Sequence, residues 1–244
     1  MRFRDRRIHN ISTLIKHLSD HSNGISAPIW YRGHFNKEWG LVPSSIRKQC
    51  ETEINLIKKF KQDATLLVSP RPAYQYEWLF IMRHHGVPTR LLDWTENPLV
   101  ATYFAVTEDM DKDGALWALL PLELNKQGGR EFDDPNSLPS FEEDEFMSAY
   151  SPENYYKDTT SKLLPIAFIA PRNTPRMQSQ LSVFTINHRD ETPIENIGDK
   201  KHFWRYIIPQ SSKENIKKEL ELLGVGKFQL FPELESIGTI LRGD

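Results

Sequence analysis

The chain has 244 residues, of which 39% are hydrophobic and 11% aromatic, which is enough to build the core of one large domain. Its 31 basic and 33 acidic residues leave a net charge of −2, which neither favours nor excludes a polyanionic partner. A lone cysteine excludes an intrachain disulfide, and no apolar run reaches the roughly 18 residues that a membrane span needs. We therefore expect a soluble cytoplasmic protein with no membrane partner.

The first half of the chain combines helix patterns with one strand pattern. Apolar residues at helical spacing predict three helices, over residues 10–21, 51–68 and 73–85. The stretch PIWYRGH predicts a short strand that ends at Gly33, and residues 41–50 predict a turn or short helix. Asn97 as a cap and Pro98 at the first helical position predict a fourth helix, LVATYFAV.

The second half adds most of the predicted sheet. Buried-strand patterns occupy residues 114–124, 163–171, 181–187 and 202–209. Residues 125–160 are rich in Gly, Pro and acids such as Asp133, Asp134, Glu143 and Asp144, so we expect a loop-rich acidic insertion. A capping box of Ser211 and Glu214 predicts a helix over 211–224, and Pro232 predicts a final one. Mixed elements without strict alternation indicate an α+β fold, a single domain over 1–244 with a mixed or antiparallel central sheet flanked by helices.

The stretch WYRGH places Arg32 at a strand end, next to Gly33. A guanidinium offers five donors in a planar fork that suits phosphate or carboxylate, and glycine lets a ligand approach the backbone closely. Pairing of Arg32 with a buried acid is an equally weighted alternative.

The segment RHHGVPTRLLDWTENPL gathers His84, His85, Arg90 and Asp93. Adjacent helical positions point about 100° apart, so both histidines rarely bind one metal ion, and we expect no metal. An ion pair between Arg90 and Asp93 would pin the loop to the following helix. The free N–H groups at the start of that helix, residues 97–99, could then hold a phosphate.

Polar residues gather again near two later elements. Arg176, Gln178 and Gln180 precede a predicted strand, where they could read an amide or a ribose or only satisfy loop backbone. Glu233 and Glu235 lie just after Pro232, where acids usually stabilise a first helical turn.

Together these stretches resemble the FRG domain, a bacterial and phage-associated family, over roughly residues 10–242. The resemblance is carried by Tyr31-Arg32-Gly33, Pro43-Ser44 with Arg47, HHGVPTRLLDWTENPLVATYFA, RMQSQLSVFT and LFPELES. The departures from the family pattern are Tyr31 for phenylalanine, Arg83 for a common glutamine, and Ser182 and Ser236 for glycine. The resemblance implies a role in toxin or phage-defence systems.

A weaker resemblance, to ADP-ribosyltransferases, implies a chemistry. By that resemblance Arg32 would grip the phosphates or ribose of NAD, Gly33 would leave room for the nicotinamide amide, and Tyr103 would stack on the nicotinamide. Glu233 or Glu235 would stabilise the positive charge that develops as nicotinamide leaves. The match departs from the family where YFA lies in a helix pattern and where the late acids follow a proline.

The resulting hypothesis is an NAD-using ADP-ribosyltransferase or NAD glycohydrolase, with NAD as the candidate substrate. The substrate-binding residues would be Gly33, His85, Thr89, Arg90, Asp93, Arg176 and Gln180. The equally weighted alternative is a non-catalytic module that binds a small anionic ligand such as a nucleotide, a nucleic acid or a protein, and regulates a partner. A third is a hydrolase with His84 or His85 as general base and Asp93 orienting it.

Overall fold

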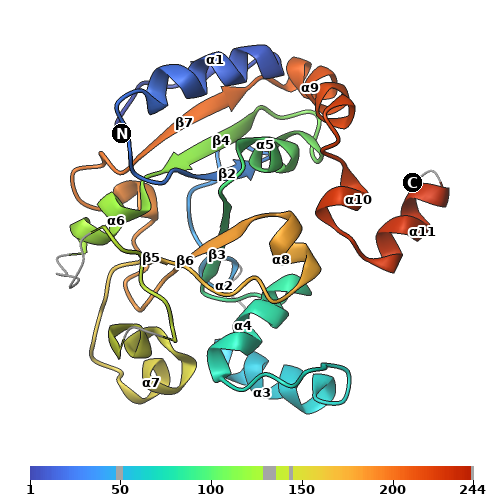
Figure 1. Ribbon diagram of the computed structural model, residues 1–244. Coiled ribbons are helices and arrows are strands. Elements are labelled where there is room, and N and C mark those ends of the chain that lie inside the picture. The colour runs from blue at the N-terminus through green and yellow to red at the C-terminus, as the bar shows by residue number, and fades with distance from the viewer. Residues whose placement is uncertain (48–51, 129–135, 143–144, 243–244) are drawn as a thin grey trace.

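A computed structural model describes residues 1–47, 52–128, 136–142 and 145–242 of the chain. Within these ranges the centre is a seven-stranded sheet in the order β1-β7-β4-β2-β3-β6-β5 (Figure 1). The strands are β1 (Arg6–Arg7), β2 (Trp30–His34), β3 (Leu91–Thr95), β4 (Gly114–Leu119), β5 (Ile166–Phe168), β6 (Ser182–Ile186) and β7 (Phe203–Ile208). β1 pairs with β7 in parallel and the other neighbours are antiparallel, which confirms an α+β fold with a mixed sheet.

Two groups of helices cover the same face of the sheet. One group is α1 (Ile11–Ser22), α5 (Pro98–Val106) and α9 (Gln210–Leu222), which pack over β2, β4 and β7. The other is α3 (Glu53–Ala64), α4 (Gln75–His84) and α8 (Pro175–Ser179), which pack over β3, β5 and β6. Because cross-strand partners share a face, the pairing of Tyr31 with Thr95 places both cores on one side.

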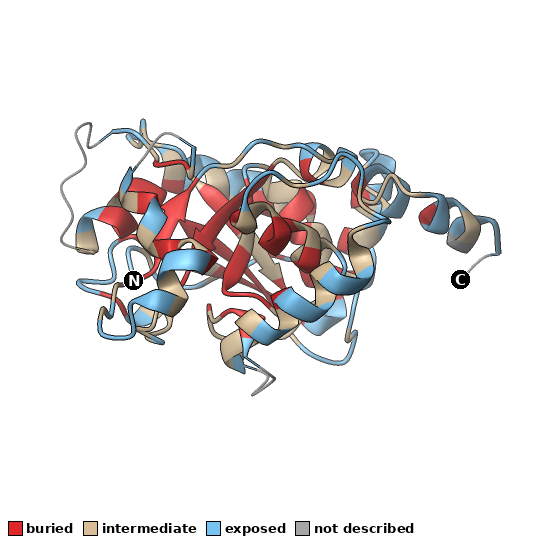
Figure 2. Ribbon diagram, turned by 90° about the horizontal axis from the view of Figure 1, so that it is seen from below, coloured by how far each residue is buried: buried red, intermediate tan, exposed pale blue. Residues whose placement is uncertain are grey.

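The opposite face carries a third core built largely from tryptophan and aliphatic side chains. Trp30, Trp94 and Trp117 project from neighbouring strands into this core. It is covered in part by α6 (Pro121–Gln127) and by the 3-10 helix η2 (Ile194–Asn196). Figure 2 shows the buried sheet enclosed between its covering elements.

Asparagine side chains cap the starts of α1 and α5, as predicted for Asn97, and the predicted capping box of α9 is wrong. The side chain of Asn10 accepts a hydrogen bond from the Thr13 N–H, and that of Asn97 accepts one from Leu99, with Pro98 at the first position of α5. In α9, however, the helix already begins at Gln210, so Ser211 lies inside it and caps nothing. The first N–H group of α9, that of Gln210, instead donates to Oδ1 of Asp113 at 2.9 Å.

Several boundaries differ from the prediction. The strand predicted over 114–124 ends at Leu119, because Pro121 opens α6. The segment 125–160 is not a loop throughout, since it contains η1 (Glu145–Tyr150) and α7 (Pro152–Lys157), and the side chains of Met147 and Tyr150 are buried. Cys50 and the acids Asp133, Asp134, Glu143 and Asp144 lie outside the described residues.

The last two helices, α10 (Lys227–Leu230) and α11 (Leu234–Arg242), extend away from the rest of the chain (Figure 1). α10 contacts α8, and the short α2 (Ser44–Arg47) lies near the junction of β2 and β3. In the part of the chain that the structure describes, no helix combines the length and the apolar character needed to cross a membrane.

Candidate functional site

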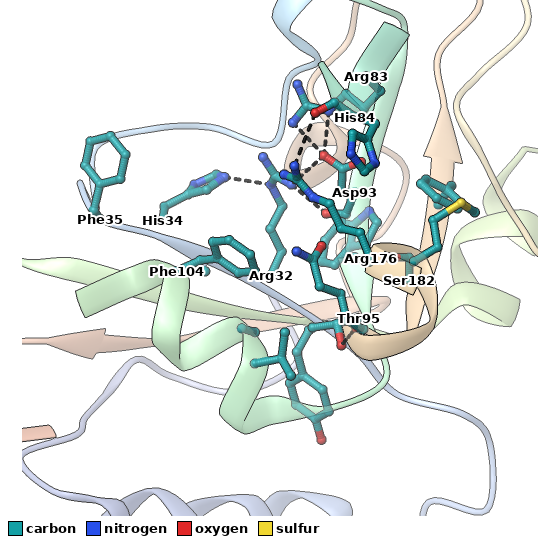
Figure 3. Close-up of a pocket in the computed structure, with 18 of the residues that line it drawn as sticks. Arg32, His34, Phe35, Arg83, His84, Asp93, Thr95, Phe104, Arg176 and Ser182 are labelled. Atoms are coloured by element: carbon teal, nitrogen blue, oxygen red, sulfur yellow. Dashed lines mark hydrogen bonds and ion pairs between the residues drawn. The ribbon is translucent and has the colours of Figure 1, made fainter. Parts of the chain in front are cut away.

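A cavity of about 340 Å³ opens between the two groups of helices, over the junction of β2 and β3 (Figure 3). Its walls come from segments that are far apart in the sequence, namely β2, β3, α4, α5 and α8. The charged and amide residues of the lining are Arg32, Arg47, Arg83, Asp93, Glu108, Arg176 and Gln180, and its aromatic residues include Phe35, Trp39 and Phe104. We call this space the Arg32 cavity.

Arg32 lies where β2 and β3 separate. Among the described residues these strands share one register pair, Tyr31 with Thr95. Beyond this pair, Nη1 of Arg32 donates to the carbonyl oxygen of Asp93 at 2.5 Å. The side chain of Arg32 thus supplies a hydrogen bond that a backbone N–H would supply in a continuous sheet. Burial lowers the pKa of Arg32 to about 10, against the raising influence of the Asp93 carboxylate. Arg32 therefore stays charged at neutral pH while most of its surface is removed from water.

His34 is a further hydrogen-bond partner of Arg32. The Nε of Arg32 donates to Nε2 of His34 at 2.9 Å, and a guanidinium can only donate, so this ring nitrogen carries no proton. The other ring nitrogen, Nδ1, lies 3.2 Å from the carbonyl oxygen of Trp39 and donates to it. Burial and the neighbouring Arg32 hold the pKa of His34 well below its usual value. His34 is thus a neutral acceptor that orients Arg32.

Asp93 is one of the two carboxylates that line the cavity, with Glu108. Its Oδ2 accepts a hydrogen bond from Arg83 Nε at 2.6 Å, and lies 2.5 Å from Arg83 Nη2 and 3.9 Å from Arg32 Nη1. Burial raises the pKa of Asp93, but the charges of Arg83 and Arg32 outweigh it, so the pKa falls below its ordinary value. The ion pair expected between Arg90 and Asp93 is wrong: Asp93 pairs with Arg83, and Arg90 pairs with Glu53.

The cavity carries an excess of positive charge. Four arginines line it, namely Arg32, Arg47, Arg83 and Arg176, against the two carboxylates of Asp93 and Glu108. The histidines add no charge, because burial lowers the pKa of both His34 and His84. Charge of one sign inside a concave, partly desolvated space attracts ligands of the other sign. The arrangement therefore favours an anion.

The edge of the cavity is closed by residues from the C-terminal part of the chain. Nε2 of His84 lies 2.9 Å from Oε1 of Glu233, and Nη1 of Arg176 lies 3.9 Å from the same oxygen. The guanidinium of Arg176 also lies over the ring of Phe231, 4.6 Å from its centroid. Glu233 therefore lies beside the charged groups of the cavity although it is far from them in sequence.

The aromatic residues form the other part of the lining. The rings of Phe35 and Trp39 meet edge to face at 4.4 Å, and Arg47 lies 4.9 Å over the ring of Trp39. Figure 3 shows Phe35 and Phe104 on one side of Arg32, away from Arg83 and Arg176. The cavity thus offers both charged donors and apolar ring surfaces.

The structure brings together some of the residues singled out in the sequence and separates others. Arg32, Gly33, Asp93, Arg176 and Gln180 line the Arg32 cavity, and Glu233 lies at its edge. Tyr103 is not in the lining of this cavity but lines an adjoining groove with residues of α9, α10 and α11, and that groove shares Phe104 and Glu108 with the cavity. Thr89 and Arg90 are buried, His85 is outside the cavity lining with its ring 6.3 Å from that of Phe60, and Glu235 is exposed on α11.

Gly33 allows helix α5 to pack closely against strand β2. A Cβ at this position would lie 1.9 Å from the carbonyl oxygen of Ala101 and 2.8 Å from the N–H nitrogen of Ala105. Helix α5 therefore lies directly on the backbone of β2, with no room for a ligand group between them. The glycine brings the helix to the strand, which differs from the expected role of admitting a nicotinamide.

Sequence reasoning missed four lining residues that matter for charge and shape, Arg47, Arg83, Phe35 and Phe104, as parts of a site. Arg83 was visible only as a departure from the common glutamine. Its partner Asp93 is ten positions away, on a strand that the sequence did not predict. Within the described residues, no group of three or more His, Cys, Asp or Glu side chains is placed to hold a metal ion.

Acidification is expected to destabilise the protein before its carboxylates titrate. Burial lowers the pKa of five histidines: His21, His34, His84, His188 (to about 4) and His202. In the unfolded chain a histidine takes up its proton near pH 6.5, so stability is full above that pH and is lost as the pH falls through it. Each histidine that stays neutral in the folded state contributes a slope of up to about 1.4 kcal/mol per pH unit.

Urea unfolding at pH 7.5, 6.5, 5.5 and 5.0 measures this slope, and His188→Gln is expected to reduce it. A free energy of unfolding that is constant or rises from pH 6.5 to 5.0 would show that these histidines are protonated in the folded protein.

Comparison with known proteins adds one match. The FRG domain family model matches residues 27–114, which run from just before β2 to the first residue of β4. No curated protein and no solved structure matched the chain. The matched segment supplies Arg32, Arg47, Arg83, Asp93 and Phe104, whereas Arg176, Gln180 and Glu233 lie beyond it. The segment that holds most of the charged lining of the cavity is thus also the one that the family model matches: residues 27–114 of this chain carry an FRG domain.

Proposed function

We propose that this protein binds a small phosphorylated ligand of the nucleotide class in the Arg32 cavity. The observation that carries the proposal is the convergence of four guanidinium groups, from Arg32, Arg47, Arg83 and Arg176, on one space that holds fewer carboxylates. Guanidinium groups bind phosphate oxygens through paired, charge-assisted hydrogen bonds. Burial strengthens such bonds, because water competes less for the charged groups.

The aromatic lining supports a nucleotide over a simple anion. Phe35, Trp39 and Phe104 offer ring faces and edges to a planar base, while the arginines lie on another side of the same cavity. A cavity of about 340 Å³ also falls within the range of small-molecule sites. A ligand that joins a phosphate to a planar ring would use both parts of the lining.

NAD cleavage is a second candidate function, and the position of Asp93 favours it. When the bond between the nicotinamide nitrogen and the ribose carbon breaks, the electron pair leaves with nicotinamide and the ribose becomes positively charged. A carboxylate that stays ionised beside phosphate-binding arginines can stabilise this charge, and Asp93 meets that description. Water or a macromolecular target would then take up the ribose carbon. NAD loss in a cell would make the protein a toxin or phage-defence effector.

Tyr103 and Glu235 have no part in this proposal, because Tyr103 lines the adjoining groove and not the Arg32 cavity, and Glu235 is exposed on α11. The alternative without catalysis is a module whose nucleotide occupancy controls a partner. Binding without turnover distinguishes that alternative from NAD cleavage.

Replacing Arg176 with glutamine is expected to weaken nucleotide binding by about tenfold or more, since a hydrogen bond to a charged group contributes about 1.5–3 kcal/mol. Isothermal titration with AMP, ADP, ATP and NAD measures the dissociation constants, and chromatography of nicotinamide measures NAD cleavage. The matched control is Arg172→Gln: its side chain is 24% exposed, against 27% for Arg176, but Arg172 pairs with Glu96 outside the cavity. Equal affinities for both variants and the parent, or no nucleotide binding at all, would reject the proposal.

A further inference from the structure

Glu233 is an acid from the C-terminal part of the chain that lies at the edge of the Arg32 cavity, beside His84 and Arg176. It lies between α10 and α11, directly after Pro232. Its Oε1 is 2.9 Å from Nε2 of His84 and 3.9 Å from Nη1 of Arg176. A carboxylate in contact with two nitrogen donors at the edge of a cationic cavity occupies a position that a ligand anion could also take.

The chain around Glu233 is held to the same edge. Nε2 of Gln180 donates to the carbonyl oxygen of Leu230 at 3.0 Å, and the Oγ of Ser179 donates to the same oxygen at 3.2 Å. The ring of Phe231 lies under Arg176 and meets Phe104 edge to face at 5.9 Å. These contacts hold Glu233 close to Arg176.

The ion pair of Glu233 with Arg176 is weak enough to be exchanged. At 3.9 Å the two groups are beyond a direct hydrogen bond, and Nη1 of Arg176 instead donates to the His84 carbonyl oxygen at 3.2 Å. The side chains of Glu233 and Arg176 are 35% and 27% exposed, but Oε1 of Glu233 itself is buried and has no partner of hydrogen-bond geometry among the described residues. A phosphate carries more charge and can accept from both donors at once.

We propose that Arg176 and His84 form a second anion subsite, which Glu233 occupies in the free protein and a ligand phosphate takes over on binding. The inference rests on the proposed function and deepens it. The ligand then carries two anionic groups, one for Arg32 and Arg83 and one for Arg176 and His84, as a diphosphate does. Displacement of Glu233 releases the segment that leads into α11, and this helix extends away from the body of the protein (Figure 1).

The test compares Glu233→Gln with Glu235→Gln. Both substitutions remove one negative charge and keep the size of the side chain, but Glu235 is exposed on α11 and outside the cavity lining. Isothermal titration with pyrophosphate is expected to show about fivefold tighter binding for Glu233→Gln, the change that corresponds to about 1 kcal/mol of lost competition. Glu235→Gln is expected to bind as the parent does. Inorganic phosphate, which fills one subsite, is expected to gain less than pyrophosphate.

A second readout follows displacement directly. Amide hydrogen exchange in 231–242 is expected to become faster when pyrophosphate binds to the parent protein. Pyrophosphate binding to the parent and to Glu233→Gln with equal constants, or more weakly to Glu233→Gln, would overturn the subsite and leave the proposed function standing. Absence of pyrophosphate binding to the parent and to both variants would overturn the two together.

Discussion

Replacing Arg90 with alanine is expected to lower the free energy of unfolding by about 3–5 kcal/mol, because it leaves a buried carboxylate without its partner. Nε of Arg90 donates to Oε2 of Glu53 at 2.7 Å, and both side chains are only 4% exposed. The guanidinium also donates to the carbonyl oxygens of Asn187 and Tyr150, each at 3.0 Å. One side chain thus joins α3, the end of β6 and η1.

Removal of the Arg90 side chain lowers the free energy of unfolding through several lost interactions. The carboxylate of Glu53 keeps a hydrogen bond from the Arg90 N–H at 2.7 Å and one from the Tyr156 hydroxyl at 3.1 Å, but it loses the only positive charge that contacts it among the described residues. The two carbonyl oxygens lose their donors in a place that water does not reach freely. Packing is lost as well, since the guanidinium lies 3.7 Å from the centroid of the Tyr155 ring.

Urea unfolding of Arg90→Ala, Glu53→Ala and the double variant measures this effect. The double variant is expected to be less destabilised than the sum of the single variants, since it leaves no charge unpaired. The control is Arg6→Ala, which breaks an ion pair with Asp20 whose side chains are 40% and 46% exposed. An exposed pair contributes no more than about 1 kcal/mol. A change for Arg90→Ala as small as that for Arg6→Ala would mean that the buried pair does not hold these elements together.

The same arginine shows what the sequence could and could not predict. Arg90 and Asp93 are three positions apart, which suggested an ion pair across a loop. The residues from Leu91 onward form β3, however, and side chains three apart along a strand point to opposite faces. β3 itself was missed because Leu91, Leu92 and Trp94 are all buried, so the alternation that marks a half-exposed strand is absent.

Sequence motifs predicted the features that depend only on neighbouring residues. Asn97 and Pro98 fix the start of α5 through a side-chain hydrogen bond and a restricted backbone, and both are legible in the sequence. Arg32 was legible as a strand residue beside glycine, but the strand does not end there, because β2 continues to His34. The partners of Arg32 were not legible, because His34, Arg83 and Asp93 meet it only after β2, α4 and β3 have packed.

The position of Glu233 illustrates the same limit. Its sequence neighbours, a proline and a second acid, predict only the start of a helix. The contact of Glu233 with His84 depends on the packing of α10 against α8. This is a tertiary contact, and neither hydrophobic periodicity nor capping residues predict it. Of the two acids that the sequence offered as equivalents, folding brings one to the cavity and leaves the other exposed.

Replacing Gly33 with alanine is expected to destabilise the protein by at least about 3 kcal/mol, at or above the upper end of the usual effect of overpacking. The added Cβ would lie 1.9 Å from the Ala101 carbonyl oxygen and 2.8 Å from the Ala105 nitrogen, and both atoms are backbone of α5. A flexible side chain could turn away from the methyl group, but a helix has to move as a unit. The strain therefore cannot be relieved without separating α5 from β2.

That separation would also disturb the Arg32 cavity, because α5 carries Phe104 and β2 carries Arg32. We expect Gly33→Ala to lose nucleotide affinity in the fraction of protein that still folds, measured by titration alongside urea unfolding. The matched control is Gly226→Ala, where the backbone has φ −138° and the new Cβ would meet only the flexible end of Gln229, at 3.1 Å. An alanine is compatible with such a position, so we expect a change within about 1 kcal/mol. If Gly33→Ala were as stable as Gly226→Ala, helix α5 could not lie as close to β2 as the position of Ala101 requires.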